Sequence, residues 1–266
     1  MFLHYRIQMS STGISLSDKT VVISGPFGLL TQSLTQALTE SGADVALLVE
    51  DAKAAQRFCQ NISDLREMSE RYGRAAAIES NPKTEKEAQI DISRCSELFG
   101  TTDVYIDTHL FSAKLPFFAK DTANAEEVFE AALQKTYLMS QGALFFLRAR
   151  HKSRIIYVFN ELDQVALEKA SSTKMNEFRE FVKKMALETI KDHIAFNALG
   201  VGVSEEFLLS RFGVGSIQSS LKQVQETLPQ AKLVEYRDIS NLLTYMSSPL
   251  SNGLNGQILR LNHGLA

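Results

Sequence analysis

Short, nearly continuous apolar runs alternate with segments of helical apolar spacing along almost the whole chain. The apolar runs are KTVVIS, ADVALLVE, AAAIES, DVYID, RIIYVF and IAFNAL. The longest helical segments between them cover residues 31–41, 52–72, 125–148 and 171–190. Strands that are apolar throughout and separated by helices are typical of a parallel sheet covered on both faces. The pattern predicts an α/β fold with a doubly wound, Rossmann-like parallel sheet.

Length and charge limit the class of protein further. The chain has 266 residues, 44% of them hydrophobic, and no linker or repeat divides it. We therefore expect a flexible N-terminal arm over 1–16 and a single domain over 17–266. A net charge of -3 argues against a nucleic-acid partner, and no apolar run reaches the roughly 20 residues of a membrane span. Without the apolar core of a signal peptide, a cytoplasmic location is expected.

The two cysteines, Cys59 and Cys95, lie apart and form no CxxC pattern. Two such residues are too few for a zinc site or a disulfide framework. We expect buried, inert thiols and no metal site.

The order of segments resembles the short-chain dehydrogenase/reductase (SDR) family over nearly the whole chain. The resemblance rests on ISGPFGLLTQSLTQALTESGADVALLV, FGTTDVYI, RIIYVFN, FNALGVG and NGQILRLNHG. It implies an NAD(P) site at the first strand-to-helix turn, where the family has T-G-x-x-x-G-x-G. The matching residues here are Ser24, Gly25, Leu29 and Thr31, and Gly28 falls one place early. Because a leucine side chain would take up ligand volume, we expect the turn without its phosphate cradle.

Two further positions of the cofactor site leave alternatives open. The family's ribose-binding acid would fall at Val49, although a one-residue shift would bring Glu50 to the ribose; a surface acid after a strand is the other interpretation. The family's N-N-A-G turn corresponds to the segment that starts Asp107-Thr108-His109. If the strand continued, Asp107 and His109 would share a face and could act as an acid/base pair. The favoured interpretation is a hydrogen-bonded turn that replaces the asparagines.

The family's catalytic Asn, Ser and Tyr are missing under this resemblance, and its Lys is present in only one of two possible registers. Ala132 stands at the asparagine and Asn160 at the serine. Two registers are open for Y-x-x-x-K: one places Ala170 and Lys174 there, and the other Ser171 and Met175. Neither supplies a phenol for proton transfer. Lys174 alone is interpreted as a solvated lysine, and Tyr137 and Tyr157 lie in the wrong elements.

These positions lead to the hypothesis of an inactive SDR-fold subunit that binds no cofactor itself, with Gly25, Gly28, Leu29, Thr31 and Glu50 as vestigial positions. Its partner would be an active SDR dehydrogenase that carries NAD, in a heterotetramer held by the helices containing Phe145 and Phe178. The nearest precedent in the family suggests a 3-hydroxyacyl-CoA type substrate, such as a (hydroxybenzyl)succinyl-CoA. Two alternatives remain: an enzyme with different chemistry in the same crevice, or a small-molecule binding and regulatory module.

Overall fold

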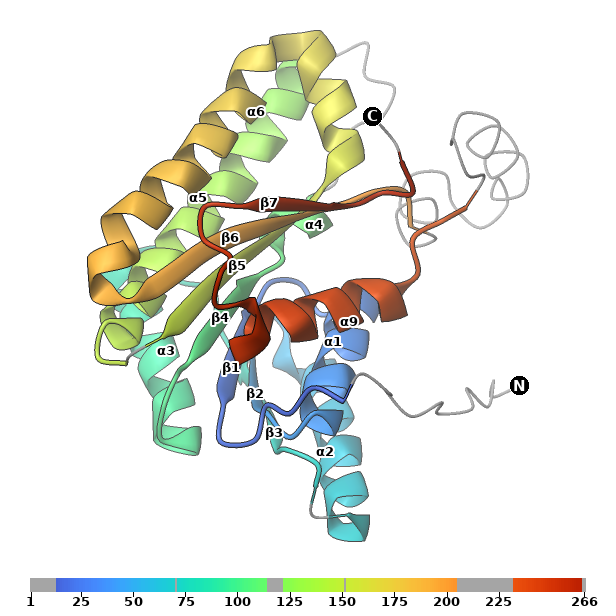
Figure 1. The fold of residues 1–266 in the computed structure, drawn as a ribbon, viewed down its shortest axis with the longest axis vertical. Helices are drawn as coiled ribbons and strands as arrows, with labels where there is room; N and C mark the ends of the chain where they lie inside the picture. Colours follow the sequence, from blue (N-terminus) through green and yellow to red (C-terminus); the bar gives the residue numbers. More distant parts are fainter. Residues whose placement is uncertain (1–12, 70, 114–121, 151, 205–231, 265–266) are drawn as a thin grey trace.

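The computed structural model describes residues 13–69, 71–113, 122–150, 152–204 and 232–264, with the backbone alone at 68, 122–126 and 162–175. Its centre is a seven-stranded sheet in the order β3-β2-β1-β4-β5-β6-β7, in which every neighbouring pair is parallel (Figure 1). The expected α/β class and the doubly wound parallel sheet are confirmed.

The strands are β1 (Thr20–Ser24), β2 (Asp44–Val49), β3 (Ala75–Glu79), β4 (Val104–Asp107), β5 (Ser153–Asn160), β6 (Ile194–Val201) and β7 (Ile258–Leu261). The α-helices are α1 (Leu29–Glu40), α2 (Ala52–Met68), α3 (Glu85–Phe99), α4 (His109–Ser112), α5 (Thr122–Leu147), α6 (Glu161–Thr189) and α9 (Tyr236–Ser247). Short 3-10 turns, η1 (Ile190–Asp192) and η3 (Pro249–Ser251), complete the described elements.

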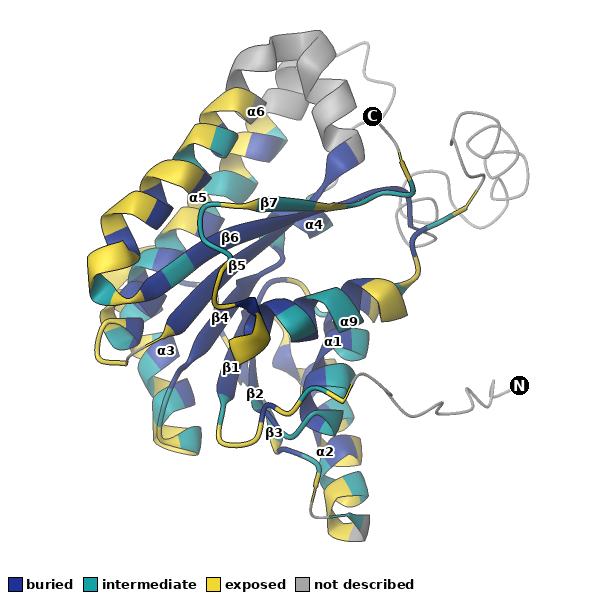
Figure 2. Cartoon of the chain, in the orientation of Figure 1, coloured by how far each residue is buried: buried dark blue, intermediate teal, exposed yellow. Residues whose placement is uncertain are grey.

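Two hydrophobic layers cover the two faces of the sheet. On one face, alternate strand residues such as Val22 and Tyr105 pack under α3, α5 and α6. On the other, residues such as Val21 and Ile106 pack under α1 and α9 (Figures 1 and 2). Because successive strand side chains point to opposite faces, strands buried on both sides must be apolar throughout, as the sequence is.

Local signals set the ends of several helices. The Thr84 hydroxyl accepts a hydrogen bond from the Glu87 N–H at the start of α3, and Gly100 ends that helix at φ 82°. The Asp51 carboxylate accepts from the Lys53 N–H at the start of α2. Such caps satisfy backbone groups that a helix end leaves unpaired, and glycine adopts the left-handed conformation without a steric cost.

Two sequence-based boundaries need correction. The helix expected from residue 171 begins at Glu161, directly after β5. Residues 161–170, ELDQVALEKA, contain no glycine or proline and consist mainly of strong helix formers, which explains the extension. At the other end, most of the expected arm lies outside the described residues, but Leu16 within it is buried and its N–H donates to the Ser41 carbonyl at 2.7 Å.

Candidate functional site

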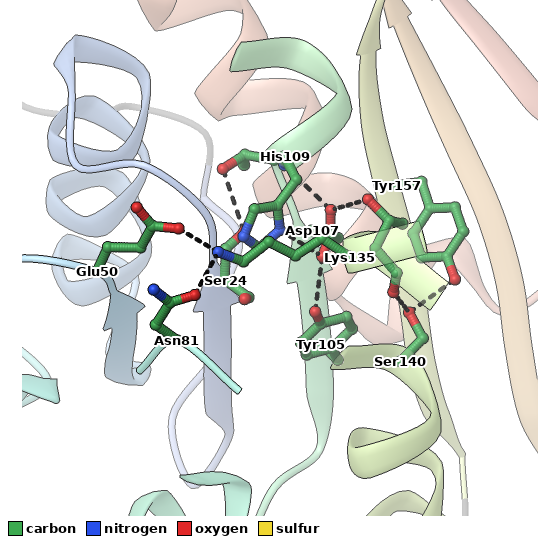
Figure 3. A network of polar contacts seen from close by, with 11 residues as sticks. Ser24, Glu50, Asn81, Tyr105, Asp107, His109, Lys135, Ser140 and Tyr157 are labelled. Carbon is green, nitrogen blue, oxygen red and sulfur yellow. Dashed lines mark hydrogen bonds and ion pairs between the residues drawn. The ribbon is translucent and has the colours of Figure 1, made fainter. Parts of the chain in front are cut away.

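The strand order reverses between β1 and β4, and the carboxyl ends of these strands define the crevice where doubly wound folds bind ligands. Ser24 ends β1 and Asp107 ends β4, and the two residues are register partners. The first glycine turn, the Asp107–His109 segment and Glu50 after β2 all lie at this edge of the sheet (Figure 3). These three predicted parts of the cofactor site thus lie at the same edge of the sheet.

Gly25 makes the sharp turn out of β1. Its φ is 146°, and a Cβ at this position would lie 2.1 Å from the Thr108 hydroxyl oxygen. Thr108 is held close because its N–H and its hydroxyl both donate to the Ser24 carbonyl, at 2.8 and 3.2 Å. The glycine is therefore required by packing between β1 and β4, whether or not a phosphate is bound.

One backbone donor at the start of α1 is satisfied within the chain. The Gly28 N–H donates to the Thr31 hydroxyl at 2.9 Å, and that hydroxyl donates back to the Gly28 carbonyl at 3.0 Å. Thr31 is buried, whereas Leu29, the first residue of α1, is 50% exposed. A backbone N–H that normally remains available to an anion at a helix N-terminus is thus used within the chain.

Asp107 is the centre of a buried polar network (Figure 3). Its Oδ2 accepts from the Tyr105 hydroxyl at 2.7 Å and lies 3.0 Å from His109 Nδ1. Its Oδ1 accepts from the Thr136 hydroxyl at 2.8 Å and from the His109 N–H at 3.1 Å. Burial by itself raises the pKa of Asp107, but the His109 charge and these hydrogen bonds hold that pKa below its usual value.

The pairing of Asp107 with His109 arises from a turn. The strand ends at Asp107, and α4 begins at His109. The Asp107 carboxylate accepts a hydrogen bond from the backbone N–H of His109, two residues on, and this turn brings the imidazole beside the same carboxylate. This agrees with the hydrogen-bonded turn expected in place of the asparagines. It also leaves an oriented imidazole beside a buried carboxylate.

Glu50, just after β2, is joined to α5 by a lysine that the sequence analysis missed. Lys135 Nζ forms an ion pair with Glu50 Oε1 and donates to Asn81 Oδ1 at 3.2 Å. Lys83 Nζ also donates to Asn81 Oδ1, at 3.1 Å. The hydrogen bond from Lys135 is the main cause that lowers the pKa of Glu50, and the charges of Lys135, His109 and Lys83 add to it.

A carboxyl group that the sequence analysis missed lies directly after β5. Glu161, the first residue of α6, is buried, with Oε1 2.7 Å from Arg260 Nε and Oε2 accepting from the Asn262 amide at 2.5 Å. It packs so closely on Gly200 that a Cβ there would lie 2.7 Å from Glu161 Cγ. Burial raises the pKa of Glu161.

A family model described as "Enoyl-(Acyl carrier protein) reductase" matches residues 30–266. The chain belongs to the short-chain dehydrogenase/reductase family. Among curated SDR relatives, 3-oxoacyl-[acyl-carrier-protein] reductase FabG of Aquifex aeolicus is 20% identical over 257 residues, which cover 95% of this chain and 99% of the relative. The 3alpha-hydroxysteroid dehydrogenase of Mediterraneibacter gnavus is 18% identical, covering 93% and 96%.

Solved SDR structures share the fold over nearly the same length. An NADPH-bound short-chain oxidoreductase from Pseudomonas aeruginosa, described as containing an atypical catalytic center, superposes with a TM-score of 0.76 at 20% identity, covering 95% of this chain and 98% of that one. An SDR from Brucella melitensis gives 0.75 at 15% identity, with the same coverage. At these identities the likeness concerns the fold alone.

The structure locates Ala132 and Asn160, which stand at catalytic positions of the family, and Tyr157, which the sequence places in the wrong element for catalysis. Ala132 is partly buried on α5 against the core, and Asn160 is buried at the end of β5. Tyr157 is fully buried within β5, where its hydroxyl donates to Ser140 Oγ at 2.7 Å and burial raises its pKa strongly. This tyrosine is therefore part of the core and remote from proton exchange with solvent.

The residues of both Y-x-x-x-K registers lie on α6. For Ala170, Ser171, Lys174 and Met175 the structure describes the helical backbone, and their side chains are outside the described part. Their helix starts ten residues earlier than the sequence pattern indicated.

The described part of this SDR chain contains no group of three or more metal-ligating side chains. Within the same residues, no helix combines the length and apolarity needed to cross a membrane. Cys59 and Cys95 are both buried, as expected, and burial raises the pKa of each thiol to about 12.

Proposed function

We propose that this chain is a catalytically inactive SDR subunit of a hetero-oligomeric dehydrogenase in which an intact relative binds NAD. The observation that carries the proposal is the start of α1, where Thr31 uses the Gly28 N–H and Leu29 stands at the first helical position. A pyrophosphate needs free backbone donors and close backbone approach at this place. The residues present do not fit that group.

The candidate proton donors support the same proposal. An SDR reaction requires a hydroxyl with an accessible proton beside the reacting carbon. Tyr157 is enclosed in the core and bonded to Ser140, and Asn160 has no ionisable group. The sequence offers alanine or serine where the resemblance implies the catalytic tyrosine.

The partner is inferred from the outer surface of α5 and α6. Tyr137 and Phe145 on α5 are 49% and 62% exposed, and Leu187 near the end of α6 is 73% exposed. Tyr137 also contacts the Phe181 ring of α6, with centroids 6.1 Å apart, so α5 and α6 lie side by side at this exposed position. Large exposed apolar surfaces favour association, and paired helices bury well against an equivalent pair.

The name of one relative supports the proposed substrate class. Aquifex FabG is named for the reduction of 3-oxoacyl groups, and the reverse of such a reaction oxidises a 3-hydroxyacyl thioester. We propose a 3-hydroxyacyl-CoA type substrate for the assembled dehydrogenase; the example of a (hydroxybenzyl)succinyl-CoA comes from the family precedent given above.

Calorimetry with NAD and NADP tests the cofactor half of the proposal. The isolated chain should not bind either dinucleotide in the low-micromolar range, because Thr31 uses the Gly28 N–H and the Leu29 side chain stands at the start of α1. A Leu29→Gly, Thr31→Gly variant frees the Gly28 N–H and removes the leucine side chain at the start of α1. The affinity of this variant for the dinucleotides should exceed that of the wild type. Low-micromolar binding by the wild-type chain would contradict the proposal.

Co-expression tests the assembly half. The chain is produced alone and with a genomic neighbour of the same fold, and mass in solution and NAD-dependent dehydrogenase activity are measured. We expect a mixed oligomer whose activity depends on both chains. A stable monomer, together with a neighbour that assembles and works equally well without it, would disprove the role.

A second candidate function is supported by the Asp107–His109 pair. A buried carboxylate 3.0 Å from Nδ1 orients the imidazole in the way that acid/base catalysis requires. Turnover by the isolated chain that is lost in His109→Gln would favour an enzyme of non-standard chemistry in the same crevice.

A further inference from the structure

Three groups from distant parts of the chain meet above the adenosine side of the crevice. Glu50 follows β2, Asn81 lies two residues after β3, and Lys135 is on α5. We name this cluster of Lys135, Glu50 and Asn81 the lysine bridge. Figure 3 shows the Lys135 side chain extending from α5 past His109 to Glu50 and Asn81.

The lysine bridge lies where a doubly wound fold would hold the ribose of a dinucleotide. In doubly wound folds a dinucleotide lies across the carboxyl ends of the strands, and an acid after the second strand accepts the ribose 2′-hydroxyl. Glu50 is the first residue after β2 and is therefore placed to accept such a hydroxyl. Here its carboxylate accepts instead from the Lys135 ammonium, whose stem crosses from the opposite side of the crevice.

We infer that Lys135 is an internal ligand that takes the place of a ribose at Glu50 and closes the adenosine side of the crevice. The inference deepens the proposed function, because it concerns the same crevice, but it depends on Lys135 and Glu50 instead of the glycine turn. The ammonium pairs with the Glu50 carboxylate, the acceptor that a ribose would otherwise use, and it also donates to the Asn81 amide oxygen, which Lys83 shares.

The ion pair of the lysine bridge is expected to be weak, because both of its side chains are partly exposed. Glu50 is 63% exposed and Lys135 is 22% exposed in their side chains. Exposed ion pairs of this kind change an equilibrium constant by up to about fivefold, and the lysine stem adds excluded volume. Removing Lys135 should therefore open the ribose position without disturbing the core.

The experiment measures binding of adenosine, which is neutral and makes no demand on the phosphate turn. Titrations followed by ligand-observed NMR compare the wild type with Lys135→Ala and Lys135→Met; the methionine keeps most of the packing of the stem. Lys83→Ala is the matched control, since Lys83 bonds to the same Asn81 oxygen. Thermal unfolding of each variant verifies the fold.

We expect adenosine to bind Lys135→Ala about fivefold more tightly than the wild type, with a smaller gain in Lys135→Met and none in Lys83→Ala. The gain should disappear when Glu50→Gln is added or when 2′-deoxyadenosine replaces adenosine. Equal affinity in the wild type and both Lys135 variants would overturn the inference, as would a gain that persists without Glu50. Either result leaves the inactive-subunit proposal standing, since that is tested by dinucleotide binding and assembly.

Discussion

At the scale of single residues, packing explains the glycine of the first turn, and hydrogen bonding explains the aspartate at the end of β4. Gly25 is required by Thr108, and Asp107 organises a network in which Tyr105, Thr136 and His109 all take part. Packing by itself therefore accounts for Gly25, whether or not a ligand is bound.

Gly25→Ala should destabilise the chain by about 2–4 kcal/mol, because the new methyl group would collide with Thr108 at a backbone φ that favours glycine. Urea unfolding measures the cost. Gly253→Ala is the control, since a Cβ there meets nothing within 4 Å. Adding Thr108→Ala should recover part of the loss; equal stability of the two single variants would contradict this account.

Asp107 should make stability depend on acid pH. Its folded pKa lies below the unfolded value of about 3.9, so its contribution is present above that pH and is lost as pH falls through the lower, folded pKa. Asp107→Asn should cost about 2–4 kcal/mol near pH 7. Because Asp103 shifts in the same direction, the relevant quantity is the difference between wild type and variant. A difference that stays constant from pH 7 to pH 2.5 would refute the prediction.

At the scale of elements, the sequence indicated most strands and helices within a few residues, because strands buried on both faces leave long apolar runs. It failed at the start of α6, where 161–170 carry helical propensity but no clear apolar stripe. It also left open which side of α5 and α6 faces the sheet. The structure places Phe178 in the core, stacked on Tyr157 with centroids 6.3 Å apart, whereas Phe145 points outward.

This difference can be measured. Phe178→Ala should lower the free energy of unfolding by about 3–5 kcal/mol, because the ring is fully buried against Tyr157 and Phe159. Phe145→Ala should change the stability of the isolated chain by less than about 1 kcal/mol, since that ring is 62% exposed. Denaturant unfolding of the two variants at low protein concentration checks the contrast, and similar losses would show that the helix faces are misassigned.

At the scale of the whole molecule, sequence spacing predicted the sheet, but the meeting of Glu50 with Lys135 could not be predicted. The two are 85 residues apart and belong to different elements, and neither lies in a motif that signals the other. The same holds for Glu161, whose polar partners are Arg260 on β7 and Asn262 directly after it. The periodicity of apolar residues along the chain is enough to predict the strands and helices. Contacts across the crevice join residues far apart in the sequence, and no local pattern signals them.

Assembly should be sensitive to charge on the outer surface of α5 and α6. Phe145→Glu together with Leu187→Glu should weaken the proposed mixed oligomer by several kcal/mol while the chain itself stays folded, because both positions are exposed in the single chain. Light scattering with the co-expressed neighbour measures the mass. Leu250→Glu, at an exposed leucine on η3, is the matched control. An unchanged mass for the double variant would place the contact elsewhere.

The two buried thiols also determine how this protein can be labelled. With pKa values of about 12, Cys59 and Cys95 hold almost no thiolate at neutral pH, and both are shielded from reagents. A cysteine introduced at an exposed position, such as Leu250, would react far faster with a maleimide than either native thiol. Site-specific fluorophores or spin labels can therefore be attached to the otherwise unaltered chain, and the distance to a partner subunit can be followed during assembly.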